Sequence, residues 1–156
     1  RVGVYYAEGP RGLTTDPSGS SHSELIDLCG GRNIADCAIT PGMGMTEVSM
    51  EQVIAWDPDV ILVENPGFYA AVGTDPAWQE ITAVKTGRVY LTPRTAFCWF
   101  DRPPGINRII GIPWTAKTLY PDLFQDMDLE SLVREYHEIF LHVSLSDDQI
   151  HQILNL

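Results

Sequence analysis

Four consecutive aliphatic residues, Val60-Ile61-Leu62-Val63, follow closely on a helix pattern that Pro58 brings to an end. An uninterrupted apolar run of this length is typical of a strand covered on both faces, as in the centre of a parallel sheet. Parallel neighbours need crossover connections, so the rest of the chain must supply helices between its strands. This run therefore favours an α/β fold in which strands and helices alternate.

Further strand patterns occur at residues 2–6, 33–35 and 88–91, and helix patterns separate them. Three capping boxes, in which a Ser and a Glu or Gln three residues later satisfy each other's free amides, are expected to begin helices at Ser21, Ser49 and Ser146. We predict a Rossmann-like three-layer α/β lobe with a mostly parallel central sheet and a helical C-terminal third, forming a single domain over residues 1–156.

Three more helix starts are less regular. Asp75-Pro76 is expected to open a short helix, because Pro suits the first helical position. Pro103-Pro104 is expected to open a longer helix that Gly111 and Pro113 weaken or kink before it ends at Tyr120-Pro121. Asp128 is expected to cap the helix that follows.

Composition argues against several classes of function. The chain has 156 residues and a net charge of -11, which disfavours binding to nucleic-acid phosphates and to anionic lipid. No apolar run approaches the roughly 18 residues that a transmembrane helix needs. The chain begins at Arg1 and enters a strand directly, so we expect it to be part of a longer protein.

The three cysteines leave two interpretations open. No CxxC pair is present, so a zinc or iron–sulfur site is not expected. Cys29 and Cys37 are the nearest pair and could form a disulfide in an exported protein, but buried free thiols are the favoured interpretation.

No catalytic signature is present: GxSxG, HExxH and the phosphate-binding GxxxxGK[ST] motif are all missing from the sequence. His137 and His142 lie five residues apart, which is the wrong spacing for two ligands on one helical face. His22 precedes a helix beside the first long loop and could contact a ligand. We therefore predict that the protein is not an enzyme and has no cofactor and no bound metal of its own.

Ligands of parallel α/β sheets bind at the carboxyl ends of the strands. The loops at residues 8–20, 65–74 and 92–102 follow strands, and the 41–46 loop is expected at the same edge. These regions carry arginines, which bind oxyanions and carboxylates, and aromatic residues, which stack on rings. The candidate ligand-binding residues are Tyr5, Tyr6, Arg11, Thr14, Thr15, Asn65, Phe68, Arg94, Trp99 and Arg102.

Four segments in register resemble one family, the substrate-binding proteins that have a helical backbone between two lobes and serve importers of iron–siderophores, haem, cobalamin and, in some branches, molybdate or tungstate. They are Gly30-Gly31-x-Asn33-Ile34-Ala35, the SMEQVIAWDPDVI stretch from Ser49 to Ile61, the Trp78 to Tyr90 segment ending in KTGRVY, and the closing helices from Phe124 to Leu145. Each is weak alone, but together they cover nearly the whole chain.

The resemblance implies that residues 1–156 are the C-terminal lobe of a two-lobe protein, whose N-terminal lobe and most of the linking helix are absent. It implies a periplasmic or otherwise extracytoplasmic location, with or without a lipid anchor, and an ABC permease as partner. The glutamate with which such a lobe docks on the permease falls on Glu51. The ligand class stays open between an oxyanion and a metal chelate (an iron–siderophore, haem or cobalamin), and the oligomeric state is also open.

Two alternatives remain at this stage. A nitrogenase-like or flavodoxin-like enzyme or regulatory domain would need a cofactor fingerprint after the first strand, and residues 6–20 contain none. A domain that binds only a protein partner would also be consistent with an exposed Glu51.

Overall fold

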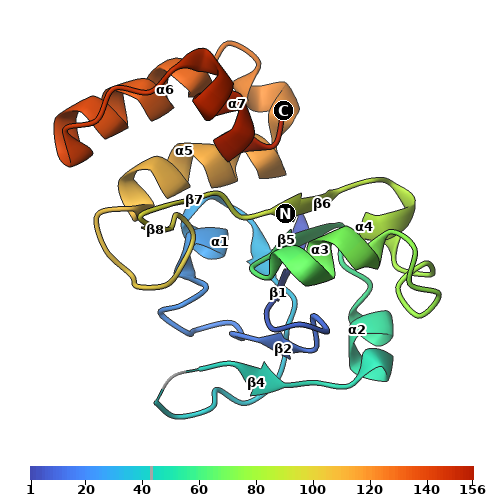
Figure 1. Cartoon of the computed structure of the whole chain (residues 1–156). Helices are drawn as coiled ribbons and strands as arrows, with labels where there is room; N and C mark the ends of the chain where they lie inside the picture. The colour runs from blue at the N-terminus through green and yellow to red at the C-terminus, as the bar shows by residue number, and fades with distance from the viewer. Residues whose placement is uncertain (43) are drawn as a thin grey trace. The chain divides into compact units, whose positions relative to one another are not determined.

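A four-stranded sheet organises the first part of the chain. In the computed structural model, which describes residues 1–42 and 44–156, the chain divides into two compact units, Arg1–Thr92 and Pro93–Leu156 (Figure 1). The sheet belongs to the first unit and has the order β3-β1-β5-β6. Met43, in the 41–46 loop, lies outside the described residues.

All neighbouring strands of this sheet are parallel. They are β1 (Gly3–Ala7), β3 (Arg32–Asn33), β5 (Val60–Val63) and β6 (Val89–Leu91). The chain leaves β1 towards β3 on one side, then returns past β1 to β5 on the other. The direction of winding therefore reverses between β1 and β5, and the carboxyl ends of these two strands form the edge at which such sheets bind ligands.

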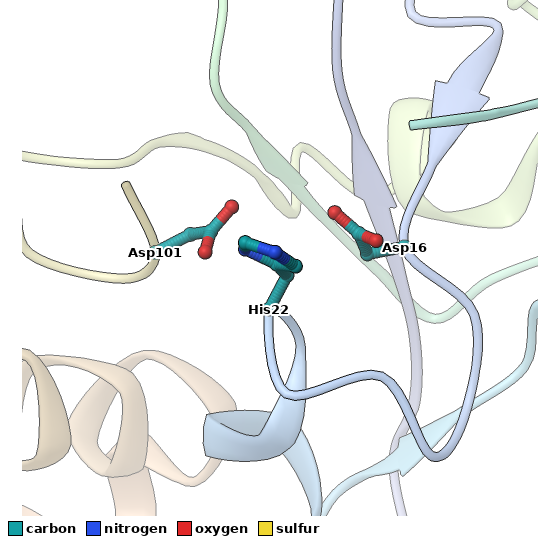
Figure 2. A group of neighbouring side chains, drawn as sticks. All are labelled: Asp16, His22 and Asp101. Atoms are coloured by element: carbon teal, nitrogen blue, oxygen red, sulfur yellow. The ribbon is translucent and has the colours of Figure 1, made fainter. Parts of the chain in front are cut away.

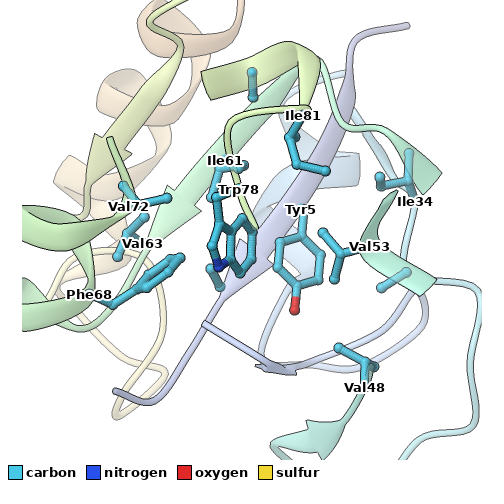
Figure 3. Packing of buried hydrophobic residues seen from close by; sticks show 13 residues of the cluster. Tyr5, Ile34, Val48, Val53, Ile61, Val63, Phe68, Val72, Trp78 and Ile81 are labelled. Atoms are coloured by element: carbon cyan, nitrogen blue, oxygen red, sulfur yellow. The ribbon is translucent and has the colours of Figure 1, made fainter. Parts of the chain in front are cut away.

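The central strands are covered on both faces, as the sequence indicated. Every residue of β5, and Val4 to Ala7 of β1, has 0% exposure. Tyr5, Ile61 and Val63 belong to one core cluster with Val53, Phe68 and Trp78 (Figure 3). Because side chains alternate along a strand, Tyr6 points to the opposite face from Tyr5.

The helices of the first unit confirm some predicted starts and correct others. α2 (Met50–Trp56) begins with the capping box of Ser49 and Gln52, and ends before Asp57, which has φ 40°. α1 (Glu24–Leu28) has Ser23 as its N-cap residue, so the helix begins later than a cap at Ser21 predicted. The Ser23 hydroxyl instead donates to the Pro17 carbonyl and accepts from Asn33, which are bonds that only the folded chain supplies.

The helix expected from Asp75-Pro76 is also wrong. Asp75 caps only a turn, accepting from the Ala77 amide at 2.9 Å, and the helix lies earlier, as α3 (Pro66–Val72). Asn65 accepts from the Phe68 amide there, and Pro66 occupies the first helical turn, so the signal was present in the sequence. A short helix, α4 (Thr82–Lys85), precedes β6.

The second unit is mainly helical, as expected. A hairpin of β7 (Arg94–Thr95) and β8 (Phe97–Cys98) is followed by α5 (Arg108–Leu119), the 3-10 turn η1 (Pro121–Phe124), α6 (Leu129–Tyr136), the π-helical turn η2 (His137–Leu141) and α7 (Asp147–Leu154). α5 begins later than Pro103 and contains Pro113 within it. Asp128 caps α6, and Ser146 with Gln149 forms the capping box of α7.

One side of this helical unit carries an apolar groove of about 190 Å³. It is lined by Ile109, Leu132, Glu135, Tyr136, Ile139 and Phe140. Ile109 and Ile139 are 49% and 54% exposed, which is unusual for adjacent large aliphatic side chains. Within the part of the chain that the structure describes, no helix combines the length and the apolarity needed to cross a bilayer.

Asp57 links the end of α2 to the start of α4. Its carboxylate accepts from the Thr82 amide and from the Thr82 hydroxyl, both at 2.8 Å. These hydrogen bonds hold the pKa of Asp57 below its usual value, and the bond from the Thr82 amide has the larger effect. A carboxyl group whose pKa is lower in the folded protein stabilises the fold at pH values above its pKa in the unfolded chain, which is about 3.9. This stabilisation is lost as the pH falls through the pKa of the folded protein.

We therefore predict that Asp57→Asn is less stable than the unaltered protein at neutral pH, and that this difference shrinks as pH falls below about 4. Asn keeps one acceptor and tolerates positive φ, so the variant should fold. Urea denaturation across a pH series measures the difference. In a Thr82→Val background, which lacks the hydroxyl donor, the pH-dependent difference should be smaller; an equal difference would contradict this account.

Candidate functional site

The loop that follows β1 folds back on itself at the ligand edge of the sheet. The Glu8 amide donates to the Thr14 carbonyl at 2.9 Å, and the Gly12 amide donates to the Gly9 carbonyl at 3.2 Å. Gly9 and Gly12 have φ of 71° and 65°, which residues with a side chain rarely adopt. The loop then enters a small antiparallel pair, β2 (Thr14–Thr15) with β4 (Thr46–Glu47), which the sequence did not predict.

Tyr5 and Phe68 support this loop from the core side. The Tyr5 hydroxyl donates to the Gly12 carbonyl at 2.9 Å, and burial raises the pKa of Tyr5. The Phe68 ring lies against Gly12, 2.4 Å from the position that a Cβ would occupy there, and its other side meets Trp78 with ring centroids 4.8 Å apart (Figure 3). Both side chains are buried, so the prediction that they contact a ligand directly does not fit the structure.

The same loop lines a pocket of about 250 Å³. Its lining combines one guanidinium, two carboxylates and a threonine with apolar side chains: Glu8, Gly9, Pro10, Arg11, Leu13, Thr14, Met45, Glu47 and Val48. Arg11 is exposed and, among the described residues, its guanidinium has no ion-pair or hydrogen-bond partner. The Thr14 hydroxyl is buried and has no hydrogen-bond partner among the same residues.

These two groups are the polar atoms most available to a ligand. A guanidinium offers a rigid fork of donors that matches an oxyanion or a carboxylate. A buried hydroxyl without a partner costs free energy that a bound acceptor or donor would recover. Of the first-unit residues predicted from the sequence, the structure therefore brings Arg11 and Thr14 together at one pocket. Reasoning from sequence missed Glu47, which only the β2–β4 pairing brings to the same place.

The remaining predicted residues of the first unit have other surroundings. Tyr6 has 0% exposure, on the sheet face opposite Tyr5. Thr15 also has 0% exposure, and its hydroxyl has no hydrogen-bond partner in the described part of the chain. Asn65 uses its side-chain oxygen to cap α3. Direct ligand contact by the fully buried Tyr6 and Thr15 does not fit this arrangement.

Asp16 and His22 lie close together in the first unit. A carboxylate oxygen of Asp16 and a ring nitrogen of His22 are within 4.8 Å of each other, and Figure 2 shows the imidazole beside this carboxylate. Asp16 is buried and accepts from the Ser20 hydroxyl at 3.1 Å. Two ligand atoms are fewer than the three or four that protein metal sites supply, so this pair alone defines no metal centre.

Cys29 and Cys37 are both half-buried and are not joined to each other by a disulfide in this structure. Burial raises the pKa of Cys37, with a further contribution from the neighbouring Asp36 carboxylate. A raised pKa keeps a thiol protonated and therefore less reactive.

In the second unit, the predicted residues lie on and after the β7–β8 hairpin. Arg94 is exposed on β7, whereas Trp99 has 0% exposure, which does not fit direct ligand contact. Arg102 pairs with the buried carboxylate of Asp101, with 3.1 Å between Nε and Oδ2. Arg108, which sequence reasoning missed, approaches the other oxygen of Asp101 at 3.9 Å and donates to the Phe100 carbonyl.

The fold agrees with the comparisons to known proteins. A family model described as "Periplasmic binding protein" matches residues 3–96. The chain therefore belongs to the periplasmic binding protein family, as its sequence motifs indicated, and its α/β class is confirmed by solved structures of that type.

Individual relatives are similar over nearly the whole chain. The molybdate-binding protein MolA of Haemophilus influenzae is 34% identical over 151 residues, which are 95% of this chain and 41% of that protein. An ABC transporter solute-binding protein from Sulfurospirillum deleyianum superposes with a TM-score of 0.94 at 40% identity, over 100% of this chain and 48% of its own. The structure of MolA bound to molybdate gives a TM-score of 0.78 at 35% identity, over 94% of this chain and 44% of its own. The chain thus spans less than half the length of these relatives.

Gly12 should be intolerant of any side chain, for two separable reasons. We predict that Gly12→Ala lowers the free energy of unfolding by about 1–2 kcal/mol for its positive φ and by about 1–3 kcal/mol more for overpacking against Phe68. Gly87→Ala is the matched control, because Gly87 has φ 70° and open space where a Cβ would lie. Urea denaturation of both variants checks this. Equal losses would show that Phe68 does not constrain the loop.

Proposed function

We propose that the protein is the substrate-binding component of an ABC importer, which captures a small oxyanion or a metal chelate outside the cytoplasm and delivers it to the membrane permease. The observation that carries this proposal is the pocket at the carboxyl end of β1, which is lined by the Arg11 guanidinium, unpaired among the described residues, and by Thr14, whose hydroxyl is buried. Family membership, and relatives that are solute-binding proteins, support it.

An oxyanion is the favoured ligand class. One relative that matches nearly the whole chain, MolA of Haemophilus influenzae, bears a name that describes molybdate binding, and its solved structure is described as bound to molybdate. A tetrahedral oxyanion presents several acceptor oxygens, which suits the guanidinium fork of Arg11 and the Thr14 hydroxyl. The Glu8 and Glu47 carboxylates would repel an anion that approached them, so the oxyanion should bind on the Arg11 side of the pocket. An iron–siderophore, haem or cobalamin is the second candidate, because carboxylates do not repel the positively charged metal ion of such chelates.

Residues 1–156 should form the C-terminal lobe of a two-lobe protein. Support comes from the coverage, since the chain matches 41% to 48% of relatives that it matches almost end to end itself. The exposed apolar groove beside Ile109 and Ile139 also supports it, because apolar surface of this kind usually packs against another part of a protein. A location in the periplasm, with or without a lipid anchor, follows from the same proposal.

Glu51 is proposed to contact the permease. It lies exposed in the first turn of α2. Hydrogen bonds from its own backbone amide and from Ser49 lower the pKa of Glu51, so the carboxylate stays ionised over a wide pH range. An exposed, fixed negative charge of this kind can pair with an arginine or lysine of a partner.

Charge changes in the pocket should separate the two ligand classes. In the full-length protein we predict that Arg11→Gln weakens molybdate binding about 10- to 100-fold, because a charged hydrogen-bond donor is lost. Arg32→Gln, at an exposed arginine of β3, is the matched control and should leave affinity unchanged. Calorimetric titration provides the dissociation constants, and an equal loss in both variants would contradict a role for Arg11.

Glu47→Gln extends the same experiment. Removing a carboxylate from the pocket should tighten binding of an anion by about 2- to 10-fold and should weaken binding of a ligand held through its metal ion. Titration with molybdate and with a ferric chelate, in separate experiments, distinguishes these outcomes. A protein that binds neither ligand would contradict the proposed function.

Docking through Glu51 predicts a loss of transport without a loss of binding. Glu51→Gln should keep ligand affinity and reduce uptake by roughly tenfold or more, because a charged contact with the permease is removed. Asp148→Asn is the matched control, since Asp148 has the same position in the capping box of α7 as Glu51 has in that of α2, and is also exposed. Uptake in reconstituted vesicles and ligand titration measure the two properties. Equal uptake by both variants would exclude the docking role.

A further inference from the structure

Three consecutive carbonyl groups in the loop between β1 and β2 each accept a hydrogen bond from a different part of the first unit. They are the carbonyls of Gly12, Leu13 and Thr14, and their donors are the Tyr5 hydroxyl at 2.9 Å, the Val48 amide at 3.0 Å and the Glu8 amide at 2.9 Å. Two of these donors are backbone amides, which every residue except proline supplies. The donor from Tyr5 is a side chain, so a change in sequence can remove it without altering the backbone.

This loop depends on such bonds because its backbone is adaptable. Gly9 and Gly12 both have positive φ, and glycine loses more conformational freedom on folding than any other residue. The Gly12 amide donates to the Gly9 carbonyl at 3.2 Å, which closes a turn around Pro10 and Arg11. The hydrogen bond from Tyr5 ties the last residue of this turn to the sheet.

Tyr5 is a rigid support for the turn. It lies in β1, which pairs with β3 on one side and with β5 on the other, and its side chain has 0% exposure. The centroids of the Trp56 and Trp78 rings lie 6.2 and 6.3 Å from that of Tyr5, and Figure 3 shows Trp78 beside it. Burial raises the pKa of Tyr5, with a smaller contribution from the Glu8 carboxylate, so the hydroxyl keeps the hydrogen that it donates.

The position of Arg11 depends on the backbone of this turn. Arg11 lines the pocket, but its guanidinium has no partner among the described residues, so no polar contact of the side chain holds it there. The neighbouring Gly12 is buried, and its carbonyl is the point at which the core holds the turn. A binding group that is held in place before the ligand arrives loses less entropy on binding.

We propose that Tyr5 is a positioning residue for ligand binding, whose hydroxyl holds the turn at residues 9–12 in the conformation in which Arg11 lines the pocket. Tyr5 is buried, so it acts through the Gly12 carbonyl and does not contact the ligand itself. All of these residues belong to the first unit. The proposal rests on the proposed function, because it assigns the pocket to the ligand.

The test compares Tyr5→Phe with Tyr69→Phe in the full-length protein. Each change removes one phenolic oxygen and keeps the ring. Tyr69 is the matched control, because it packs against the same core cluster and its hydroxyl makes no hydrogen bond to any residue that the structure describes. Calorimetric titration with molybdate measures affinity. Hydrogen exchange at the Gly12 amide reports on the turn, and exchange at the amides of β5 reports on the rest of the fold.

We expect Tyr5→Phe to weaken molybdate binding about fivefold and to accelerate exchange at the Gly12 amide by a similar factor, because one hydrogen bond is lost. Tyr69→Phe should match the unaltered protein in both measurements. Exchange in β5 should change in neither variant.

A double-mutant cycle with Arg11→Gln separates positioning of the turn from general support of the fold. If Tyr5 acts through Arg11, Tyr5→Phe should weaken molybdate binding by less than about twofold in the Arg11→Gln background. A hydroxyl that only stabilised the fold would have the same effect in both backgrounds.

Unchanged exchange at the Gly12 amide would show that the hydroxyl does not hold the turn. Faster exchange with unchanged affinity would show that the turn does not set binding, and the proposed function would survive either result. An equal loss of affinity in both backgrounds, or a loss of protection throughout β5, would leave Tyr5 with a structural role only. If the unaltered protein binds no molybdate, the proposed oxyanion function fails, and the positioning role fails with it.

Discussion

The parallel pairing of β1 with β5 is the constraint on which the first unit depends. Four residue pairs, from Val4 with Val60 to Ala7 with Val63, align two strands whose side chains are fully buried on both faces. A strand covered on both faces needs helices above and below it, and the connection from β1 to β5 that this pairing requires carries α1 and α2. The same pairing fixes where the chain reverses its winding, and the pocket lies at that edge.

Much of the fold could be predicted because its signals are local. The apolar run of β5, the capping boxes at Ser49 and Ser146 and the stop at Pro58 each act within a few residues, and each is present in the structure. One error, at Asp75-Pro76, missed a local signal, the Asn65 cap before Pro66. The other, at the start of α1, lies where distant contacts form: the Ser23 hydroxyl hydrogen-bonds to Pro17 and Asn33, and no short window of sequence reveals these partners.

The site was only partly predictable for the same reason. Arg11 and Thr14 follow a strand, so their place at the ligand edge could be inferred from the order of elements. Glu47 reaches the pocket through a strand pair whose members are about thirty residues apart. Tyr5, Phe68 and Trp99 have the composition of ligand contacts, but an aromatic ring below a loop and one lining a pocket look alike in sequence, and burial assigned these three to the core.

Gly12 lies against the Phe68 ring of the core, and its chain neighbours Arg11 and Leu13 line the pocket together with Thr14. Arg11 is exposed and can be exchanged without disturbing the packing of the Tyr5, Phe68 and Trp78 rings, whereas Val48 lines the same pocket and belongs to their core cluster. Relatives that share this loop could diverge in the solutes they carry while their folding stability stays constant. Selection on ligand preference can then act on Arg11 at little cost in stability, whereas a change at Val48 alters both properties.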